Sequence, residues 1–555
     1  MTGDGTTASI GWGFTMTQDT PDGPTRRTYL RLTAASGAAL AAGTAPGAAA
    51  GTHSRRDVTI RSDEATNPID LAATVYRPAG ASAEDPVPMI LHSHGWGGSR
   101  TSSEGAFRTE LDAGFGVLSF DQRGHGESGG RAHVQEPDRE GRDVIAVLDF
   151  VADLEWVARS PPRGRPIPKP DNPTVFAMGR SYGGAYQLVG ALTETCLQGY
   201  TRFDALAPQI TWHDLPESLA PEDVVRTTWV SALYASGAGM VPRHVHEGFA
   251  YGTATGRWPD GDDPGEPDTD GRFHDNGPVG FLEQDVRLDV PVLFGQGLSD
   301  NLFNLNQAWK NMERTLTDEA REESAVVGYN GGHALPNAVP PGDGSFGGVA
   351  AGPAAYEETR LRFFEAVRDD EGTARSVVGS PYRLETASGD RRVAVDALDD
   401  RTEFGEVDLT VYGDGEGGLG VATTSTAAST TGVGAPVHLP LAAGPLTVAG
   451  VPRLSASVTT AGLDQRLFFA LSVGESPATA QVVQNNVLPL HEPWPVVTAD
   501  RTVELPGVAV AVDSGETLHL MLTAVSDMFP GHGSVRTPGT VVLEDLSVGV
   551  PVTES

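Results

Sequence analysis

Short apolar runs alternate with helical patterns over the first two thirds of the chain. The runs at residues 89–91, 115–120 and 175–178 are long enough for buried strands and too short for helices. Residues 139–154 instead place their apolar side chains at helical spacing. The alternation predicts an α/β domain, which we expect to span residues 55–375. At 555 residues the chain is too long for one ordinary core, so two or three domains are expected.

The stretch from residue 212 to residue 286 interrupts this alternation. Helical pieces at residues 221–235 and 243–251 alternate with an acidic loop at residues 260–270. Such an insertion predicts a helical cap, which would wall the active site and exclude water. We interpret the acidic loop as a solvated surface rather than as a clamp for substrate.

From residue 381 the pattern changes to alternating, β-branched runs punctuated by glycine. Clear examples are residues 407–412, 454–459, 467–471, 518–522 and 541–544. Short strands separated by turn signals predict a β-sandwich, which we expect to occupy residues 381–555. A carbohydrate-binding module is the rival interpretation, but Trp494 is the single tryptophan of the segment.

A serine stands where one of the buried strands turns into a helix. The sequence G-R-S-Y-G at residues 179–183 matches G-x-S-x-G, directly after the run at residues 175–178. Small flanking residues let the backbone turn sharply enough to expose the serine hydroxyl above the sheet. Ser181 is therefore the candidate nucleophile. The pentapeptide alone is a weak signal in a glycine-rich chain, so the remaining motifs matter.

A glycine-rich loop follows the early strand at residues 89–91. Its sequence H-G-W-G-G at residues 94–98 is of the kind that supplies one donor of an oxyanion hole in α/β-hydrolases. We expect the backbone N–H groups of Trp96 and Tyr182 to be the two donors. They would stabilise the charge that develops on a carbonyl oxygen during attack.

Two further residues complete a Ser, Asp, His order along the chain. Asp300 follows the strand expected at residues 290–294, and His333 follows the strand expected at residues 325–329. As general base His333 would take the Ser181 proton, and Asp300 would fix its tautomer. Asp285 and Asp289 are weaker alternatives for the acid.

The loop D-Q-R-G-H-G at residues 121–126 carries another histidine. His125 precedes the serine in the chain, so we do not assign it a catalytic role. We expect this loop to be a structural corner in which Asp121 pairs with Arg123.

The charge balance is strongly acidic, with 73 acidic against 39 basic residues and a net charge of −34. Lysine occurs only at Lys169 and Lys310. Such a surface disfavours nucleic acid, which needs basic patches. Spread acid with little lysine resembles proteins of salt-loving archaea, in which salt screens the repulsion between carboxylates. An acidic protein from an ordinary environment is the alternative.

The N-terminal region resembles an export signal. The sequence T-R-R-T-Y-L-R at residues 25–31 precedes a weakly apolar, Ala/Gly-rich run through residue 50. Residues 1–50 are thus predicted to be a twin-arginine signal region, and the mature protein to be secreted. A disordered tail is the alternative. No later segment has eighteen consecutive apolar residues, so no membrane span is expected in the mature chain.

Cysteine and metal chemistry are not indicated. Cys196 is the single cysteine, which excludes an internal disulfide and a cysteine metal cluster. It falls in the helical stretch after Ser181, where we expect a buried thiol. The C-terminal segment shows no metal-ligand spacing, since His491 and His532 are isolated there, and no metal or cofactor is expected.

With these residues in hand, the chain resembles the cocaine esterase and X-prolyl dipeptidyl aminopeptidase family of α/β-hydrolases, over about residues 55–550. The resemblance implies the Ser181, Asp300 and His333 triad and makes the C-terminal sandwich a jelly roll. One departure concerns the oxyanion hole. Several members of this family add a tyrosine hydroxyl to it, and Trp96 occupies the corresponding position here.

The expected activity is that of a secreted serine hydrolase working through an acyl-enzyme intermediate. Its substrate is a small ester, as for an acyl esterase, or a short peptide cleaved after an N-terminal X-Pro dipeptide. The peptidase needs carboxylates that hold a free substrate ammonium. A non-catalytic surface protein with the same fold is a further alternative. The oligomeric state does not follow from the sequence.

Overall fold

The computed structural model describes residues 52–62, 68–159, 172–333, 345–346, 354–413, 419–423, 429–430, 435–530 and 538–553. Residues Gly51–Ser555 form one compact unit. The expected twin-arginine region at residues 1–50 lies outside the described residues. No helix in the described ranges is both long enough and apolar enough to cross a membrane.

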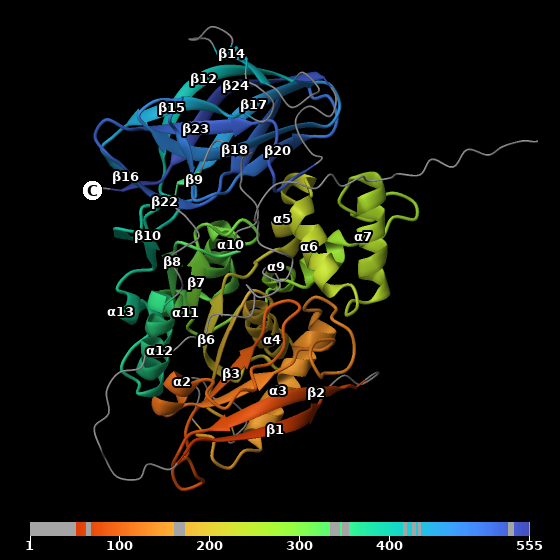
Figure 1. Ribbon diagram of the computed structural model, residues 1–555, viewed down its shortest axis with the longest axis vertical. Coiled ribbons are helices and arrows are strands. Elements are labelled where there is room, and N and C mark those ends of the chain that lie inside the picture. Colours follow the sequence, from red (N-terminus) through yellow and green to blue (C-terminus); the bar gives the residue numbers. More distant parts are fainter. Residues whose placement is uncertain are drawn as a thin grey trace, which may run out of the picture. The chain divides into compact units, whose positions relative to one another are not determined.

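A ten-stranded sheet forms the α/β part, in the order β1-β2-β4-β3-β5-β6-β7-β8-β10-β11 (Figure 1). Its strands are β1 Ser54–Arg61, β2 Asp70–Arg77, β3 Met89–Ser93, β4 Gly116–Phe120, β5 Val175–Arg180, β6 Phe203–Gln209, β7 Leu293–Gly297, β8 Ala325–Tyr329, β10 Tyr382–Glu385 and β11 Arg392–Val395. The predicted hairpin of β1 and β2 is antiparallel. From β4 through β3 and β5 to β8 and β10, neighbouring strands run parallel, so their carboxyl ends meet at one edge of the sheet.

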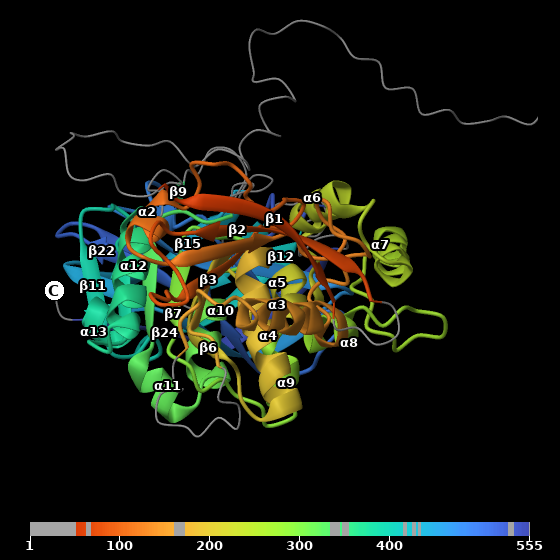
Figure 2. The ribbon, with the colours of Figure 1, turned by 90° about the horizontal axis from the view of Figure 1, so that it is seen from below.

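Helices cover both faces of this sheet, because its central strands are apolar on both sides. In β5, Val175 and Ala177 belong to one buried cluster, whereas Phe176 and Met178 belong to another. The first cluster is completed by α3 (Arg142–Ala152) and α4 (Tyr182–Gln198). The second is completed by α2 (Arg108–Asp112), α12 (Ala354–Arg368) and α13 (Ala374–Val378) (Figure 2).

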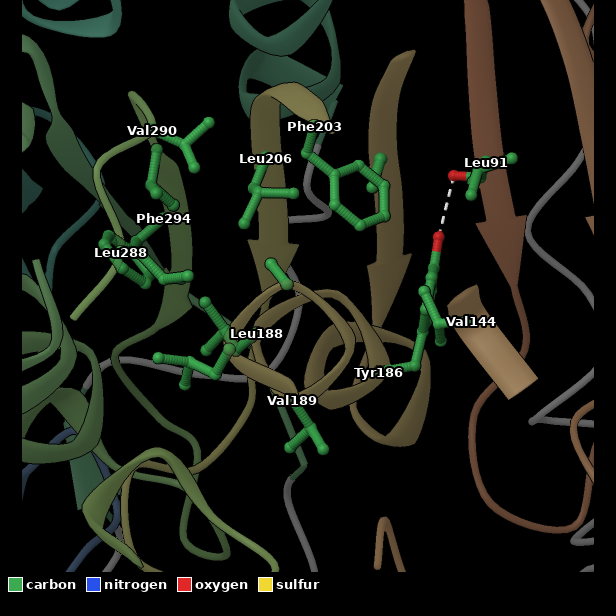
Figure 3. Close-up of a cluster of buried hydrophobic side chains, with 14 of the residues drawn as sticks. Leu91, Val144, Tyr186, Leu188, Val189, Phe203, Leu206, Leu288, Val290 and Phe294 are labelled. Carbon is green, nitrogen blue, oxygen red and sulfur yellow. Dashed lines mark hydrogen bonds between the residues drawn. The ribbon is translucent and has the colours of Figure 1, made fainter. Parts of the chain in front are cut away.

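The core under α4 anchors the helix that begins beside the candidate nucleophile. Tyr186, Leu188 and Val189 of α4 are buried against the sheet (Figure 3). The Tyr186 hydroxyl donates to the carbonyl of Leu91 on β3 at 2.8 Å, so this buried polar atom is satisfied. The helix is thereby fixed against two strands of the sheet.

A set of helices forms the predicted cap between β6 and β7. It comprises α5 Leu215–Leu219, the 3₁₀ turn η2 Pro221–Asp223, α6 Thr227–Gly237, α7 Arg243–Thr255, α8 Asp270–Asp275 and α9 Pro278–Leu282. Apolar residues of α5, α6 and α8 pack with Tyr182 of α4 and with Leu302 and Phe303 after β7. The cap therefore lies over the carboxyl edge of the sheet.

The C-terminal part is rich in β-structure, as predicted. Two six-stranded sheets share one apolar core. One sheet contributes β12 Thr402–Gly413, β17 Arg453–Ala461 and β24 Gly539–Val550, and the other contributes β18 Gln465–Gly474 and β23 Thr517–Thr523. A shared core between two sheets is a β-sandwich. The jelly-roll connection of its strands stays a prediction.

Two expectations are wrong at the element scale. Residues 382–395 were expected in the sandwich. Strand β10 instead pairs with β8 and extends the ten-stranded sheet of the α/β part, where Tyr382 and Leu384 are fully buried. Cys196 was expected to be buried, but it is exposed. It lies in the last turn of α4, beyond the part of the helix that the core covers.

Candidate active site

The turn from β5 to α4 presents Ser181 in a strained conformation. Its φ of 57° and ψ of −122° are rarely adopted by a residue with a side chain, and strain of this kind gathers at functional sites. The neighbouring glycines make the turn possible. A Cβ on Gly183 would lie 2.4 Å from the Ser93 carbonyl oxygen, and one on Gly179 would lie 2.2 Å from the Gly183 carbonyl oxygen. The structure thus has the sharp turn that the G-x-S-x-G motif predicts.

Asp300 and His333 lie together at the same edge of the sheet. The loops after β7 and β8 carry them, and His333 Nδ1 is 2.7 Å from Asp300 Oδ2. The carboxylate is fully buried. It also accepts the backbone N–H groups of Leu302, Phe303 and His333 at 3.0, 2.7 and 2.9 Å. These bonds fix the carboxylate that holds the imidazole.

Ser181 and the imidazole of His333 lie in the same apolar environment. Ser181 and Phe303 line the same cavity, and the Phe303 ring stands at 89° to the His333 ring with 5.4 Å between centroids. Ser181 Oγ and the His333 ring are not hydrogen-bonded to each other among the described residues. Catalytic hydrogen bonds of this kind often tighten only once substrate is bound.

The expected oxyanion donors flank Ser181. A Cβ on Gly95 would lie 3.8 Å from the Ser181 Cβ, so the loop that carries Trp96 passes beside the serine. Within the described part of the chain, neither the Trp96 N–H nor the Tyr182 N–H donates to an acceptor. The Trp96 indole N–H donates to the Leu233 carbonyl of α6 at 2.9 Å. The indole is therefore occupied by the cap, and the backbone is the donor left for a carbonyl oxygen.

The loop at residues 121–126 is a structural corner, but its predicted ion pair is wrong. Asp121 pairs with Arg100, and Arg123 pairs with Asp143 of α3 at 2.7 Å. In each pair the partner, Arg100 or Asp143, lies outside the loop, so the loop is tied to its surroundings. His125 packs against Trp96 and is buried. Burial lowers the pKa of His125 to about 4, so the ring is neutral behind the oxyanion loop.

A cavity of about 370 Å³ opens between Ser181 and the cap. Its walls are mostly apolar side chains of the cap, among them Leu215, Leu219, Val230, Leu233, Val245, Phe249, Trp258 and Phe273. None of the described residues that line it is Asp or Glu. The charged residue in its lining is Arg257, whose guanidinium pairs with Asp263 at 2.9 Å. The described part of the cavity lining therefore suits an apolar group and offers no carboxylate to a cation.

Sequence reasoning missed the residues that support His333. Asn301 donates its backbone N–H to the His333 carbonyl at 3.0 Å, and its side-chain oxygen accepts the indole N–H of Trp229 at 2.9 Å. The Trp229 ring stands at 90° to the His333 ring, with 5.8 Å between centroids. Asn486 of the sandwich donates to the Asp300 carbonyl at 2.9 Å. The position of Asn301 next to Asp300 was the one available signal.

Comparison with known proteins agrees with this architecture. Residues 67–334 match the profile of the X-Pro dipeptidyl-peptidase (S15) family. An uncharacterised protein of Pseudomonas aeruginosa is 36% identical over 93 residues, which is 16% of this chain and 25% of that protein. The chain thus matches about a quarter of the length of this curated relative.

Solved structures of low identity share the fold over nearly the whole chain. A CocE/NonD family hydrolase from Staphylococcus aureus superposes with a TM-score of 0.57 at 12% identity, covering 90% of this chain and 93% of that one. An aminopeptidase from a marine sediment Thaumarchaeota archaeon superposes with a TM-score of 0.57 at 14% identity, covering 94% of this chain and 99% of that one. An α-amino acid ester hydrolase superposes with a TM-score of 0.54 at 13% identity, covering 92% of this chain and 98% of that one. The chain therefore has a CocE/NonD-type α/β-hydrolase fold, and its residues 67–334 are similar to the X-Pro dipeptidyl-peptidase (S15) family of hydrolases.

Proposed function

We propose that this hydrolase is a serine esterase in which Ser181 attacks the carbonyl carbon of an ester. His333 takes the Ser181 proton and passes it to the leaving alcohol, and Asp300 holds the imidazole in the required tautomer. The Trp96 and Tyr182 N–H groups stabilise the oxyanion of the tetrahedral intermediate. Water then releases the acid from the acyl-enzyme by the same steps.

The composition of the cavity beside Ser181 favours an ester over an X-Pro peptide as the substrate. A dipeptidyl-peptidase must hold the free ammonium of its substrate, and an ammonium in an apolar site needs a paired charge. The described lining of the 370 Å³ cavity provides no carboxylate for it. An ester brings no such charge, so its apolar part enters the same site without an unpaired ion.

The second candidate function is the cleavage of X-Pro dipeptides, because the family that residues 67–334 match is named for this activity. Hydrolysis of p-nitrophenyl acetate and of Gly-Pro-p-nitroanilide distinguishes the two candidates. We expect turnover of the acetate, little turnover of the anilide, and a loss of at least about 1,000-fold in kcat in Ser181→Ala. Efficient anilide cleavage would contradict the esterase, and activity retained in Ser181→Ala would remove the proposed triad.

We also propose that the protein is exported through its twin arginines at residues 26–27. The pair precedes an apolar, Ala/Gly-rich run, which is the order expected of such a signal. Conversion of both arginines to lysine should keep the enzyme inside the cell, as measured by esterase activity in the medium and in the cell lysate. Unchanged export of the double variant would exclude this route.

A further inference from the structure

The cavity beside Ser181 is built almost entirely by the cap. Ser181, Tyr182 and Trp96 form its wall on the side of the sheet, and the facing walls come from α5, α6, α7 and α8. Helices α6 and α7 lie side by side in both views of the ribbon (Figures 1 and 2). Tyr234 of α6 stacks on Phe249 of α7 with 3.6 Å between ring centroids. This stack holds the two helices together along the cavity.

The volume of this cavity exceeds what a small ester needs. An apolar cavity of ~150 Å³ holds one benzene ring, and the cap cavity measures about 370 Å³. At the same packing it has room for about fifteen carbon atoms. An acetyl or methyl group would fill only a small part of it.

Helix α7 leaves this space open through its glycines. Val245, Gly248, Phe249 and Gly252 recur at helical spacing along one face, and all four line the cavity together with Gly256, the residue that caps the end of the helix. A Cβ on Gly248 would lie 2.2 Å from Thr269 Oγ1, so close packing explains that glycine. A Cβ on Gly252 would meet the Arg257 carbonyl at 3.2 Å and then Pro259 at 4.0 Å. Close packing therefore explains this glycine less well than it explains Gly248. Because glycine destabilises a helix interior relative to alanine, its presence at residue 252 needs another reason.

We infer that the cap cavity binds a long aliphatic or aryl-alkyl chain of the ester, and that Gly252 determines the chain length accepted. The inference rests on the proposed esterase function and narrows its substrates to esters with an extended apolar chain. The chain lies against α6 and α7 while the ester carbonyl reaches Ser181. Whether the chain belongs to the acid or to the alcohol is distinguished by the substrates of the test.

Two series of substrates test the chain-length dependence. The first consists of p-nitrophenyl acetate, butyrate, octanoate and laurate, and the second of acetates of alcohols of the same lengths. Since each buried methylene favours binding, we expect kcat/KM to rise at least about tenfold from the shortest to the eight-carbon chain in one series. A chain-length dependence that is flat in both series would overturn the inference while leaving a Ser181-dependent acetate esterase intact. Absence of Ser181-dependent acetate hydrolysis would instead refute the proposed function.

Gly252→Leu tests the position of the chain. The leucine side chain would occupy part of the cavity, so the ratio of kcat/KM for the eight-carbon ester to kcat/KM for the acetate should fall at least about tenfold. Ala250→Leu is the matched control, because it adds a large side chain to an exposed position of the same helix and should change neither value.

A second variant covers the case in which Gly252→Leu does not fold. Val230→Phe enlarges a cavity-lining side chain on α6 and should shorten the preferred chain in the same way. Thermal melting identifies which variants are folded. If a folded variant loses acetate and octanoate turnover to the same extent, or loses neither, the cavity does not hold the chain and the inference fails.

Discussion

Gly332 decides whether His333 can turn back toward Asp300. Its φ of 117° lies in a region that side chains rarely adopt, and a Cβ there would lie 2.5 Å from the Asp300 Cβ. A glycine at this position is therefore a condition for the 2.7 Å contact between the imidazole and the carboxylate. At the residue scale, this glycine matters to the site as much as the contact between the imidazole and the carboxylate does.

Gly332→Ala should consequently lower kcat for p-nitrophenyl acetate by ~10- to 100-fold, since a displacement of about 1 Å can cost that much. Gly80→Ala is the control. Gly80 has a similar φ of 90°, but a Cβ there would meet nothing within 4 Å. The control should lose stability without losing kcat. Equal kcat in the two variants would show that His333 tolerates the change.

A second prediction at this scale concerns Glu140, which is buried beside the start of α3. Burial is the main reason that the pKa of Glu140 rises from 4.5 to about 8. The folded state thus holds this proton more tightly than the unfolded state. The corresponding stability is fully present below pH 4.5 and is lost as the pH rises through 8.

Glu140→Gln should remove this dependence, because the amide mimics the protonated carboxyl and does not titrate. Melting temperatures measured between pH 5 and pH 9 should fall more steeply for the wild type than for the variant. The other carboxylates titrate in both proteins and cancel in the comparison. Parallel curves would mean that Glu140 is ionised in the folded protein.

At the scale of elements, helix α6 links the two halves of the proposed site. Trp229, near its beginning, contacts His333 and bonds Asn301, and the carbonyl of Leu233, one turn on, accepts the Trp96 indole N–H. A loop of the sandwich anchors the same helix, because Thr228 donates to the Asp527 carbonyl at 2.8 Å. The helix therefore helps to position His333 and the loop that carries Trp96 together.

Trp229→Phe should keep the aromatic contact with His333 and lose the bond to Asn301. We expect kcat for p-nitrophenyl acetate to fall by ~3- to 10-fold with KM nearly unchanged, as a lost hydrogen bond of ~1 kcal/mol suggests. Tyr234→Phe is the control on the same helix, since it keeps the aromatic ring beside the cavity and removes only the bond to His246. A change in KM alone would indicate that Trp229 shapes the cavity rather than the base.

The elements that the sequence predicted well are those with a local signal. The apolar runs became β3, β4, β5 and β8, because a buried parallel strand must be apolar on both faces. The turn at Ser181 and the loops carrying Asp300 and His333 followed from motifs. The partners of Asp121 and Arg123, the bond between Trp229 and Asn301, and the membership of β10 in the catalytic sheet depend on contacts distant in sequence, for which one chain has no local signal.

At the scale of the whole molecule, the net charge of −34 affects stability. Repulsion among carboxylates reaches about 30 Å at 0.01 M salt and about 3 Å at 1 M. The melting temperature should therefore rise as NaCl increases from 0.01 to 1 M. Sucrose at matched osmolality is the control, because it does not screen charge. A melting temperature that does not rise with NaCl would contradict this electrostatic explanation.

The bond from Asn486 to the Asp300 carbonyl makes the sandwich part of the site, although no sandwich residue is assigned a chemical step. Gln484 adds a bond to Asn330 at 3.0 Å in the loop that leads to His333. A catalytic part cut free after residue 395 would leave both of these loops without their outer support. For protein engineering, the sandwich is thus not an exchangeable module: a graft from another protein would have to reproduce these two amide side chains before Asp300 and His333 could keep their places.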